Sequence, residues 1–428
     1  MSFAFYKEIN FKGTPIGEIP KDWELVKLSD IAEDIYYGIT AKAVENKTGL
    51  KMLRTTDIKD YIVDWDSLPF CEVTEKRGDI QRFLLKKGDL IIARAGTTGV
   101  SVLVEKDFEN VIFGSYLIKV RLSRKVLPKF MRYFCQSRLY WDHITSSQAG
   151  STLKNISLPV LRSLNVPLPS SIEEQQKIAE ILSTVDKAIQ KTNEVIAKTE
   201  RLKKGLMQEL LTKGIGHKEF KDTEIGRIPS RWEVIKLSDK TQVKEGFYGK
   251  RSAEGTIIQL KADSIGDHGR INPGAYALIS VKKDVSEYFL RPGDILMSNR
   301  NSEDLVGKVA IFKGEFNQCV FSNLLTRIRV CSTDLLPEWL LYILIKMWDD
   351  GALRALSTRA VNQVLLRKGT VEKLKIPLPP LDEQQKIVKI LLAVDEKLEI
   401  ERKEKAKLEI IKQGLMSLFL TGKIRVKI

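Results

Sequence analysis

Two long stretches of the chain carry apolar residues at the spacing of an amphipathic helix. The first follows the segment VPLPSS, and its apolar positions fall near one stripe: Ile178, Ile181, Val185, Ala188, Val195, Leu202 and Leu206. The second follows IPLPPL and repeats the pattern with Ile387, Ile390, Val394, Leu398 and Leu408. Polar and charged residues fill the other positions, which is typical of a helix that buries one face. Ser171, with Glu174 three residues later, predicts a capping box at the first helix start.

Each stretch would form a helix of about 40 residues, or roughly 60 Å at ~1.5 Å per residue. Such a helix gains most of its stability from packing its apolar face, so we expect the two to pair as a coiled coil. Both belong to one chain and each follows its own globular segment. An antiparallel pair is therefore favoured, with the globular parts at opposite ends.

The globular segments are predicted to consist mainly of short strands. LLKKGDLIIAR at 84–94 places a Lys-Gly-Asp turn before an apolar run, and SYLIKVRL at 115–122 alternates as a strand does. Leu127-Pro128 then opens a helical stretch through His143, and a matching stretch begins at Leu336-Pro337 and ends near Leu356. We expect the aromatic residues of the first stretch to lie in the core: Phe130, Tyr133, Phe134, Tyr140 and Trp141. The fold class is α+β.

The whole pattern occurs twice, with an offset of about 209 residues. The segments outside the domain interiors match at that offset: 11–20 with 220–229, Trp23-Glu24 with Trp232-Glu233, EQQKI at 174–178 and 383–387, and Gly205-Leu206-Met207 with Gly414-Leu415-Met416. The interiors diverge but keep landmarks: Tyr37-Gly38 with Tyr248-Gly249, 85–94 with 290–300, and 113–122 with 321–330. Two related modules that do similar jobs on different targets would show this pattern.

Composition limits the function classes. The 428 residues allow two to four domains, and 43% hydrophobic with 29% charged residues is ordinary for a globular protein. The net charge of +15 fits either a basic protein without a polyanionic partner or a surface that binds phosphate, and charge alone does not choose between DNA, RNA and anionic lipid. Four dispersed cysteines and three histidines argue against a zinc site or a disulfide framework. With neither a signal peptide nor an apolar span expected, the location predicted by elimination is cytoplasmic.

The duplicated unit, the PLP break, the EQQKI helix start and the GLMQELL and GLMSLFL helix ends resemble the specificity subunit of type I restriction–modification systems. The openings IGEIP with Trp23-Glu24, and IGRIP with Trp232, are similar to the starts of that family's target-recognition domains. The resemblance covers nearly the whole chain.

The resemblance implies two target-recognition domains separated by the helix pair, each reading one half of a split double-stranded DNA site. The helices act as a ruler, and their length bounds the separation near two turns of DNA, at ~34 Å per turn. The implied partners are DNA adenine methyltransferase (modification) subunits, two in number, and restriction subunits. S-adenosylmethionine would bind the modification subunit, so this chain would need no cofactor and would not be an enzyme.

The sequence lacks the catalytic motifs that an enzyme of this kind would need. The chain has no GxxxxGK[ST] phosphate loop, and its one Pro-Pro, Pro379-Pro380, is followed by leucine, unlike the Pro-Pro-aromatic element of amino-methyltransferases. The acidic run at 381–384 is interpreted as a helix start. Asp89 and Asp294 follow glycine and are predicted to shape turns. His143, His217 and His268 lack metal-ligand spacing, so no metal site is expected.

Base reading requires Arg, Asn, Gln and Lys side chains on loops, and phosphate contacts require scattered Lys, Arg, Ser and Thr. In the first repeat these are Arg54, Thr55, Arg94, Thr97, Thr98, Lys154 and Asn155. In the second they are Lys250, Arg251, Asn299, Arg300, Asn301, Arg359, Asn362 and Gln363. The loop at 96–99 lets the backbone approach DNA closely, although an ordinary turn would have the same residues. Taken singly, each candidate is also compatible with a solvated surface position.

The division predicted from these patterns is 1–169 for the first recognition domain, 170–213 for the first helix, 214–379 for the second domain and 380–422 for the second helix. Two other functions remain open at this point. One is a stand-alone sequence-specific DNA-binding adaptor without methyltransferase partners. The other is a coiled-coil scaffold with protein-binding ends.

Overall fold

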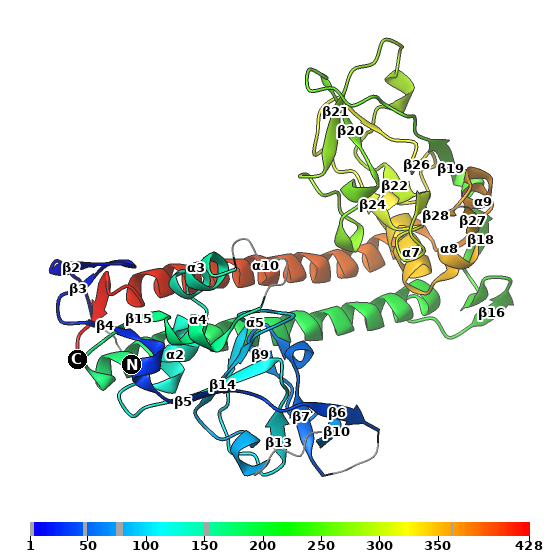
Figure 1. Cartoon of the computed structure of the whole chain (residues 1–428). Coiled ribbons are helices and arrows are strands. Elements are labelled where there is room, and N and C mark those ends of the chain that lie inside the picture. The colour runs from blue at the N-terminus through cyan, green and yellow to red at the C-terminus, as the bar shows by residue number, and fades with distance from the viewer. Residues whose placement is uncertain (1–3, 46–48, 74–79, 149–154, 361–362) are drawn as a thin grey trace. The chain divides into compact units, whose positions relative to one another are not determined.

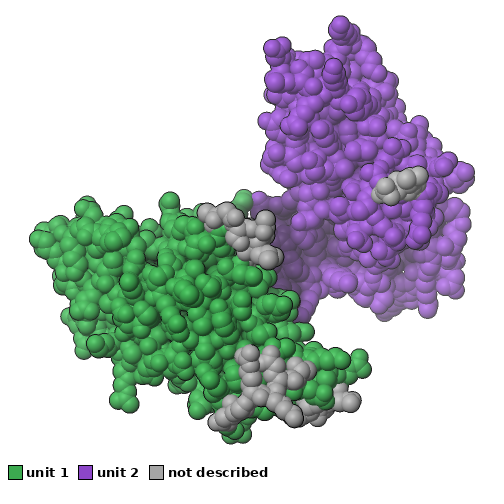
Figure 2. Space-filling view, in the orientation of Figure 1, with its two compact units in different colours: residues 1–193, 403–428 green, residues 194–402 purple. Residues whose placement is uncertain are grey.

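The structure, a computed structural model, describes residues 4–45, 49–73, 80–148, 155–360 and 363–428. It forms two compact units, which Figure 2 colours separately. Unit 1 comprises Met1–Asn193 with Lys403–Ile428, and unit 2 comprises Glu194–Arg402. The division falls within both long helices, so each unit contains one globular domain and part of each helix.

The described part of unit 1 contains two four-stranded sheets (Figure 1). The first is antiparallel and has the order β12 (Ser101–Leu103), β11 (Asp89–Ala93), β14 (Leu117–Leu122), β5 (Ala32–Tyr37). The second has the order β13 (Val111–Phe113), β7 (Lys51–Leu53), β10 (Phe70–Val73), β6 (Ala41–Val44), with β13 and β7 parallel. Short pairs are β15 (Asn165–Leu168) with β4 (Glu24–Lys27), β2 (Phe11–Thr14) with β3 (Gly17–Pro20), β8 (Ile58–Lys59) with β9 (Ile62–Val63), and β1 (Phe5–Lys7) with β30 (Ile424–Val426). The short helices are α1 (Leu28–Ile31), α2 (Pro128–Phe134), α3 (Arg138–Ser146) and α4 (Leu158–Arg162).

Strand β11 explains why the sequence carries an uninterrupted apolar run. Leu90 and Ile92 pack into the core formed with the helices, while Ile91 and Ala93 pack into the core beneath the second sheet. A strand covered on both faces needs apolar residues at every position rather than at alternate ones. The prediction of a buried strand at 84–94 is confirmed.

Unit 2 repeats this architecture. Its antiparallel sheet has the order β24 (Val309–Ile311), β22 (Ile295–Ser298), β26 (Leu325–Val330), β19 (Thr241–Glu245). A second sheet has the order β21 (Tyr276–Ile279), β20 (Ile257–Leu260), β25 (Cys319–Phe321), and a third has the order β23 (Arg300–Asn301), β28 (Gln363–Leu365), β27 (Thr358–Ala360). Short pairs are β16 (Phe220–Thr223) with β17 (Gly226–Pro229) and β18 (Glu233–Lys236) with β29 (Lys375–Leu378). The short helices are α6 (Leu237–Lys240), α7 (Pro337–Asp349), α8 (Ala352–Ala355) and α9 (Lys368–Glu372).

The stretches predicted to be helical before the PLP breaks are helical, but each is divided in two, into α2 and α3 in the first repeat and into α7 and α8 in the second. Between α2 and α3 the side chain of Ser137 caps the new helix by accepting from the Tyr140 N–H. Between α7 and α8, Gly351 has φ +77°, a left-handed conformation that ends a helix. The core assignment of the aromatic residues holds: Phe130, Tyr133, Phe134 and Tyr140 are buried, and Trp141 is half-buried against the same core.

The long helices α5 (Ile172–Lys213) and α10 (Leu381–Phe419) form the expected antiparallel coiled coil. In unit 2, Glu200 pairs with Arg402 and Lys203 with Asp395, both at 2.6 Å, so the partner number falls as the α5 number rises. The predicted stripe is wrong at Leu202, which is 56% exposed, and at Ile390, which is 39% exposed. The buried side of α5 at this level carries Thr199 and Lys203, one turn apart, which turns Leu202 away from the partner helix.

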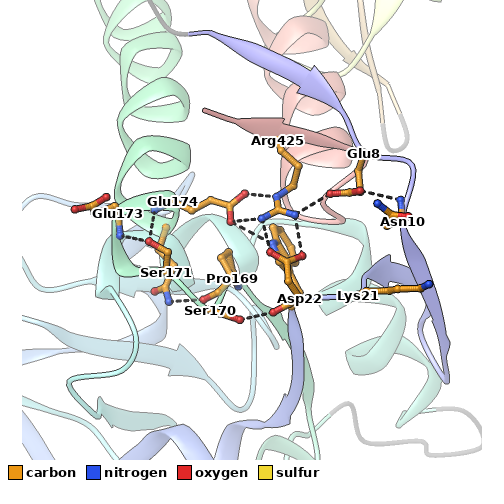
Figure 3. A network of polar contacts seen from close by, with 12 residues as sticks. Glu8, Asn10, Lys21, Asp22, Pro169, Ser170, Ser171, Glu173, Glu174 and Arg425 are labelled. Atoms are coloured by element: carbon orange, nitrogen blue, oxygen red, sulfur yellow. Dashed lines mark hydrogen bonds and ion pairs between the residues drawn. The ribbon is translucent and has the colours of Figure 1, made fainter. Parts of the chain in front are cut away.

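The start of α5 is tied to the last strand of the chain through Arg425 (Figure 3). Ser171 caps the helix by accepting from the Glu173 N–H at 3.1 Å. A capping box would also have the Glu174 carboxylate accept from the Ser171 backbone N–H, but this carboxylate has other partners. The carboxylate of Glu174 is buried and binds the Trp23 indole and the Arg425 guanidinium, with 2.8 Å from Arg425 Nη2 to Glu174 Oε2. The capping-box prediction was therefore right for Ser171 and wrong for Glu174.

Arg425 also pairs with Glu8 at 2.9 Å and Asp22 at 2.8 Å. It lies on β30, which pairs with β1, so one guanidinium joins both terminal segments to the globular domain of unit 1 and to helix α5. In unit 2 the equivalent carboxylate, Glu383, accepts from the Trp232 indole at 2.9 Å and lies 2.8 Å from His217 Nε2. The run at 381–384 is a helix start, as predicted, and Glu383 anchors that start to the second domain.

Candidate nucleic-acid interface

In unit 1 the candidates centre on Arg94, the residue after strand β11. Its N–H donates to the Tyr116 carbonyl at 2.9 Å, and its own carbonyl accepts from the Ile156 N–H at 2.9 Å. Its guanidinium carbon lies 4.3 Å from the centre of the Tyr37 ring, and the Tyr37 hydroxyl accepts from the Leu158 N–H at 3.1 Å. The arginine is therefore held over an aromatic ring that is itself anchored.

The loop after Arg94 comes close to the segment that carries Thr55. A Cβ built on Gly96 would lie 3.5 Å from Thr55 Oγ1, in ordinary contact. Thr97 is exposed and Thr98 half-buried on this loop. Arg54 is exposed, but its guanidinium pairs with Asp57 at 2.7 Å, a contact that burial of Arg54 against DNA would have to accommodate.

The remaining candidates of the first repeat follow helix α3. Asn155 is exposed and directly precedes Ile156, whose N–H binds the Arg94 carbonyl. Lys154 lies outside the described residues. The backbone thus brings Thr55, Arg94 with its loop, and Asn155 into one region of unit 1.

In unit 2 the third sheet gathers most of the candidates. In this sheet β23 pairs Arg300 with Leu365 and Asn301 with Val364 of β28, and β27 pairs Arg359 with the same Val364. Directly opposed residues of antiparallel strands share a face, so Asn301 and Arg359 lie on one face and Arg300 on the other. Gln363 is exposed on the central strand, and Asn362 lies outside the described residues.

The Arg300 face borders a hollow of about 470 Å³. Its lining is Glu245, Gly246, Asn299, Arg300, Asn323, Leu365, Arg367, Lys368 and Gly369. Asn299 is 3% exposed, and its side-chain Nδ2 donates to Thr326 Oγ1 at 3.1 Å. Three cations with a buried amide form a polar recess that suits a nucleotide better than an apolar ligand.

Lys250 and Arg251 lie on a separate loop beside β21. Both are exposed, and Arg251 forms an isolated bridge with Ile279. They belong to the same unit as the hollow but are not among its lining residues.

The structure corrects one correspondence between the repeats. The Gly38 N–H binds the Leu117 carbonyl at 3.0 Å, and the Gly246 N–H binds the Leu325 carbonyl at 3.1 Å. A Cβ on either glycine would lie 2.2 Å from a backbone oxygen. Gly38 therefore corresponds to Gly246, and its pairing with Gly249 was wrong.

Backbone hydrogen bonds also show that Arg94 of the first repeat and Asn299 of the second occupy equivalent positions. The Asn299 N–H binds the Leu324 carbonyl and its carbonyl accepts from the Leu366 N–H, as the Arg94 backbone does with Tyr116 and Ile156. Matching segment 85–94 with 290–300 by sequence puts Arg94 level with Arg300, which lies one residue after Asn299. The strand-end position thus carries different polar residues in the two domains.

Sequence reasoning missed Tyr37 as the platform under Arg94, and missed Arg367 and Lys368 in the hollow. The signal for Tyr37 was present, since it directly precedes the glycine that the backbone requires. Arg367 and Lys368 lie at the start of the short helix α9, in a region where the repeats diverge, so nothing in the sequence marked them.

The acidic candidates are structural. Asp89 accepts from the Lys86 N–H at 2.8 Å and pairs with Arg121 at 3.0 Å, and Asp294 does the same with the Arg291 N–H and Arg329. Burial raises the pKa of the Asp89 carboxyl. Both residues close the turn before the central strand, which confirms the predicted turn role.

The described residues offer neither a metal site nor a membrane-spanning helix. No group of three or more His, Cys, Asp and Glu side chains there could hold a metal ion. Among the described helices, none combines the length and the apolar character that crossing a membrane requires.

Comparisons with known proteins agree with the repeat. The family model described as "Type I restriction modification DNA specificity domain" matches residues 20–201 and 229–410. A Methanocaldococcus jannaschii protein named as the type I restriction enzyme MjaX specificity subunit is 35% identical, over 99% of this chain and 98% of its own length. The MjaVIII specificity subunit of the same organism is 30% identical over the same shares.

Among solved structures, a type I restriction–modification S subunit from M. genitalium covers 95% of this chain and 99% of its own, with 17% identity and a TM-score of 0.58. A chain from a structure concerned with assembly of the type I R-M system gives the same coverage, 18% identity and a TM-score of 0.58. These two likenesses support the fold.

Proposed function

The chain belongs to the type I restriction–modification DNA specificity family, and on that premise we propose that each of its two domains reads one half of a bipartite, gapped DNA site. The observation that carries this proposal is the strand-end position, where one backbone arrangement presents Arg94 in one domain and Asn299 in the other. Two copies of one scaffold with different polar side chains at the same place are suited to reading two different sequences.

The proposed DNA contacts are those predicted from the sequence: Arg54, Thr55, Arg94, Thr97, Thr98, Lys154, Asn155, Lys250, Arg251, Asn299, Arg300, Asn301, Arg359, Asn362 and Gln363. Arg367 and Lys368 join them because they line the hollow beside Asn299. The net charge of +15 favours an electrostatic contribution from phosphate contacts.

The helix pair is proposed to set the spacing between half-sites and to dock the modification subunits. Helix α5 has 42 residues, which corresponds to a length of about 60 Å at ~1.5 Å per residue. Apolar side chains remain exposed along the helices, with Leu202 at 56%, Ile400 at 66% and Ile410 at 72%. Such residues on an otherwise charged helix favour a partner helix. Because the helix ends are repeated, we propose two modification subunits.

Methyl transfer and cleavage are assigned to the partner subunits, with S-adenosylmethionine on the modification subunit. This chain then contributes recognition and no catalytic step. The division at 1–169, 170–213, 214–379 and 380–422 is proposed to separate the readers from the helices.

The test is to map methylated adenines in a host genome with and without this gene, and then with a chain in which residues 24–168 come from another family member. That exchange keeps β4 paired with β15 and leaves Glu8, Asp22 and Glu174 with Arg425. We expect one half of the site to change and the other half and the spacing to remain. Retention of the complete original site would contradict the proposal, and tight specific binding by the isolated chain would favour a stand-alone adaptor.

A further inference from the structure

The strand-end position of each domain carries a buried polar side-chain atom that lacks a hydrogen-bond partner among the described residues. In unit 1 this atom is Arg94 Nε, a donor, and in unit 2 it is Asn299 Oδ1, an acceptor. A buried polar group without a partner is unfavourable, and proteins seldom leave one in place. Six further buried side-chain atoms among the described residues also lack a hydrogen-bond partner, but these two occupy equivalent positions in the two domains, which points to a ligand that completes the bonding.

The surroundings of Arg94 orient a donor. Its guanidinium lies over the Tyr37 ring, 4.3 Å from the ring centre, and Tyr37 is fixed by the Leu158 N–H. Arginine has five N–H donors and no acceptor, so it can pair only with acceptors. In the major groove guanine presents two acceptors, O6 and N7, which match the guanidinium fork.

The surroundings of Asn299 orient an acceptor. One N–H of its amide is engaged by Thr326 Oγ1, and Oδ1 has no hydrogen-bond partner among the described residues. Asn299 lines the hollow together with Arg300, Arg367 and Lys368. The exposed donors that a base edge offers in the major groove are the amino groups, N6 of adenine and N4 of cytosine. The three cations nearby suit the phosphates that flank such a base.

Resting on the proposed function, we propose that this strand-end position selects one base in each half-site. Arg94 donates to a guanine in the half-site of the first domain. Asn299 accepts from the exocyclic amino group of an adenine or a cytosine in the half-site of the second domain. The opposite hydrogen-bonding character of the two side chains is then one source of the difference between half-sites.

The experiment uses the assembled methyltransferase complex and duplexes in which every base pair of the site is varied singly. Arg94→Leu and Asn299→Leu are each expected to lose about tenfold or more of discrimination at one base pair, in one half-site only, with the first loss at a guanine. Asn299→Asp, which keeps an acceptor, should retain the discrimination ratio even where overall affinity falls. Duplexes that lack the adenine N6 or the cytosine N4 amino group distinguish the two bases: wild type should lose its preference with one of them and keep it with the other.

Arg138→Leu and Lys282→Leu serve as controls, because Arg138 has a 92% exposed side chain and Lys282 is exposed. A uniform loss of affinity over all sequences, or a loss in both half-sites, would overturn the proposed selection while leaving the bipartite site in place. Absence of a bipartite methylation pattern with the wild-type chain would instead overturn the proposed function. Thermal melting of each complex confirms that the variants are folded.

Discussion

Lys203 of α5 and Asp395 of α10 form an ion pair of 2.6 Å between nearly buried side chains. Tyr342 of α7 donates to the same carboxylate at 2.7 Å, so one aspartate joins the second domain to both helices. Unit 1 repeats the arrangement, with Asp186 bound by Lys412 at 2.8 Å and by the Tyr133 hydroxyl at 2.9 Å. The lysine, the aspartate and the tyrosine all recur at the repeat offset. In each unit they hold the globular domain against the two long helices.

Replacing either tyrosine with phenylalanine should weaken the contact between the domain and the helices. Tyr342→Phe and Tyr133→Phe each remove a hydrogen bond to a carboxylate, and we expect the free energy of unfolding to fall by about 1.5–2 kcal/mol. Denaturant unfolding of the full chain measures this. Tyr116→Phe is the matched control, because Tyr116 is 65% exposed and should change stability little. An equal effect of all three variants would show that the carboxylate bonds contribute nothing specific.

The two lysines should differ in their contribution. Lys203→Ala leaves Asp395 buried without its cation, which should cost about 3 kcal/mol. Lys412 and Asp186 are more exposed, at 18% and 24%, and Arg132 lies 3.9 Å from the same carboxylate, so Lys412→Ala should cost about 1 kcal/mol or less. Parallel unfolding curves test the order. A larger loss for Lys412→Ala would contradict the role of burial.

The architecture was predictable because it is repeated. A 3.6-residue stripe, a Pro-rich break and a duplicated helix start are local signals, and they located α5, α10 and the buried strand β11. The tie between Glu174 and Arg425 joins positions 251 residues apart in sequence, so no local pattern indicated it. The local rule instead assigned Glu174 to a capping box, which tertiary contacts overrode.

The candidate interface was predictable only in part. Arg94, Arg300 and Asn301 come soon after a strand that the sequence marks clearly, so their positions could be predicted. The equivalence of Arg94 with Asn299 depends on backbone hydrogen bonds to Tyr116 and Leu324. The loops between the matched segments differ in length in the two repeats. The sequence therefore did not show which residues correspond, and Gly38 was paired with the wrong glycine.

Arg425→Met should destabilise the chain in a pH-dependent way. The hydrogen bond from Arg425 lowers the pKa of Asp22, and the backbone N–H of Asn10, with Arg425 contributing after it, lowers the pKa of Glu8. A lowered carboxyl pKa contributes stability that is present above its ordinary value of ~4 and is lost as the pH falls through the folded-state value. The difference in Tm between wild type and variant should therefore be largest at pH 7 and shrink below about pH 4.

Melting curves at pH 7, 5 and 3 measure this difference. Lys427→Met is the control, since it removes an exposed charge from the same terminal segment. A difference between wild type and Arg425→Met that stays constant with pH would mean that Arg425 acts by packing rather than by charge.

Gly205 and Gly414 occupy equivalent positions inside α5 and α10, and both are exposed. A Cβ built on either glycine meets no atom within 4 Å, and neither has a positive φ, so the free chain gives no reason for glycine there. Glycine inside a helix costs about 1 kcal/mol relative to alanine. Gly205→Ala and Gly414→Ala should each raise the free energy of unfolding of the free chain by about that amount.

If these sites receive a partner helix at close range, the same variants should weaken binding of the modification subunit, because the added methyl group occupies the space of the approaching backbone. Titration of the modification subunit into each variant measures this affinity. Greater stability with unchanged affinity would show that neither glycine lies in the contact with the modification subunit.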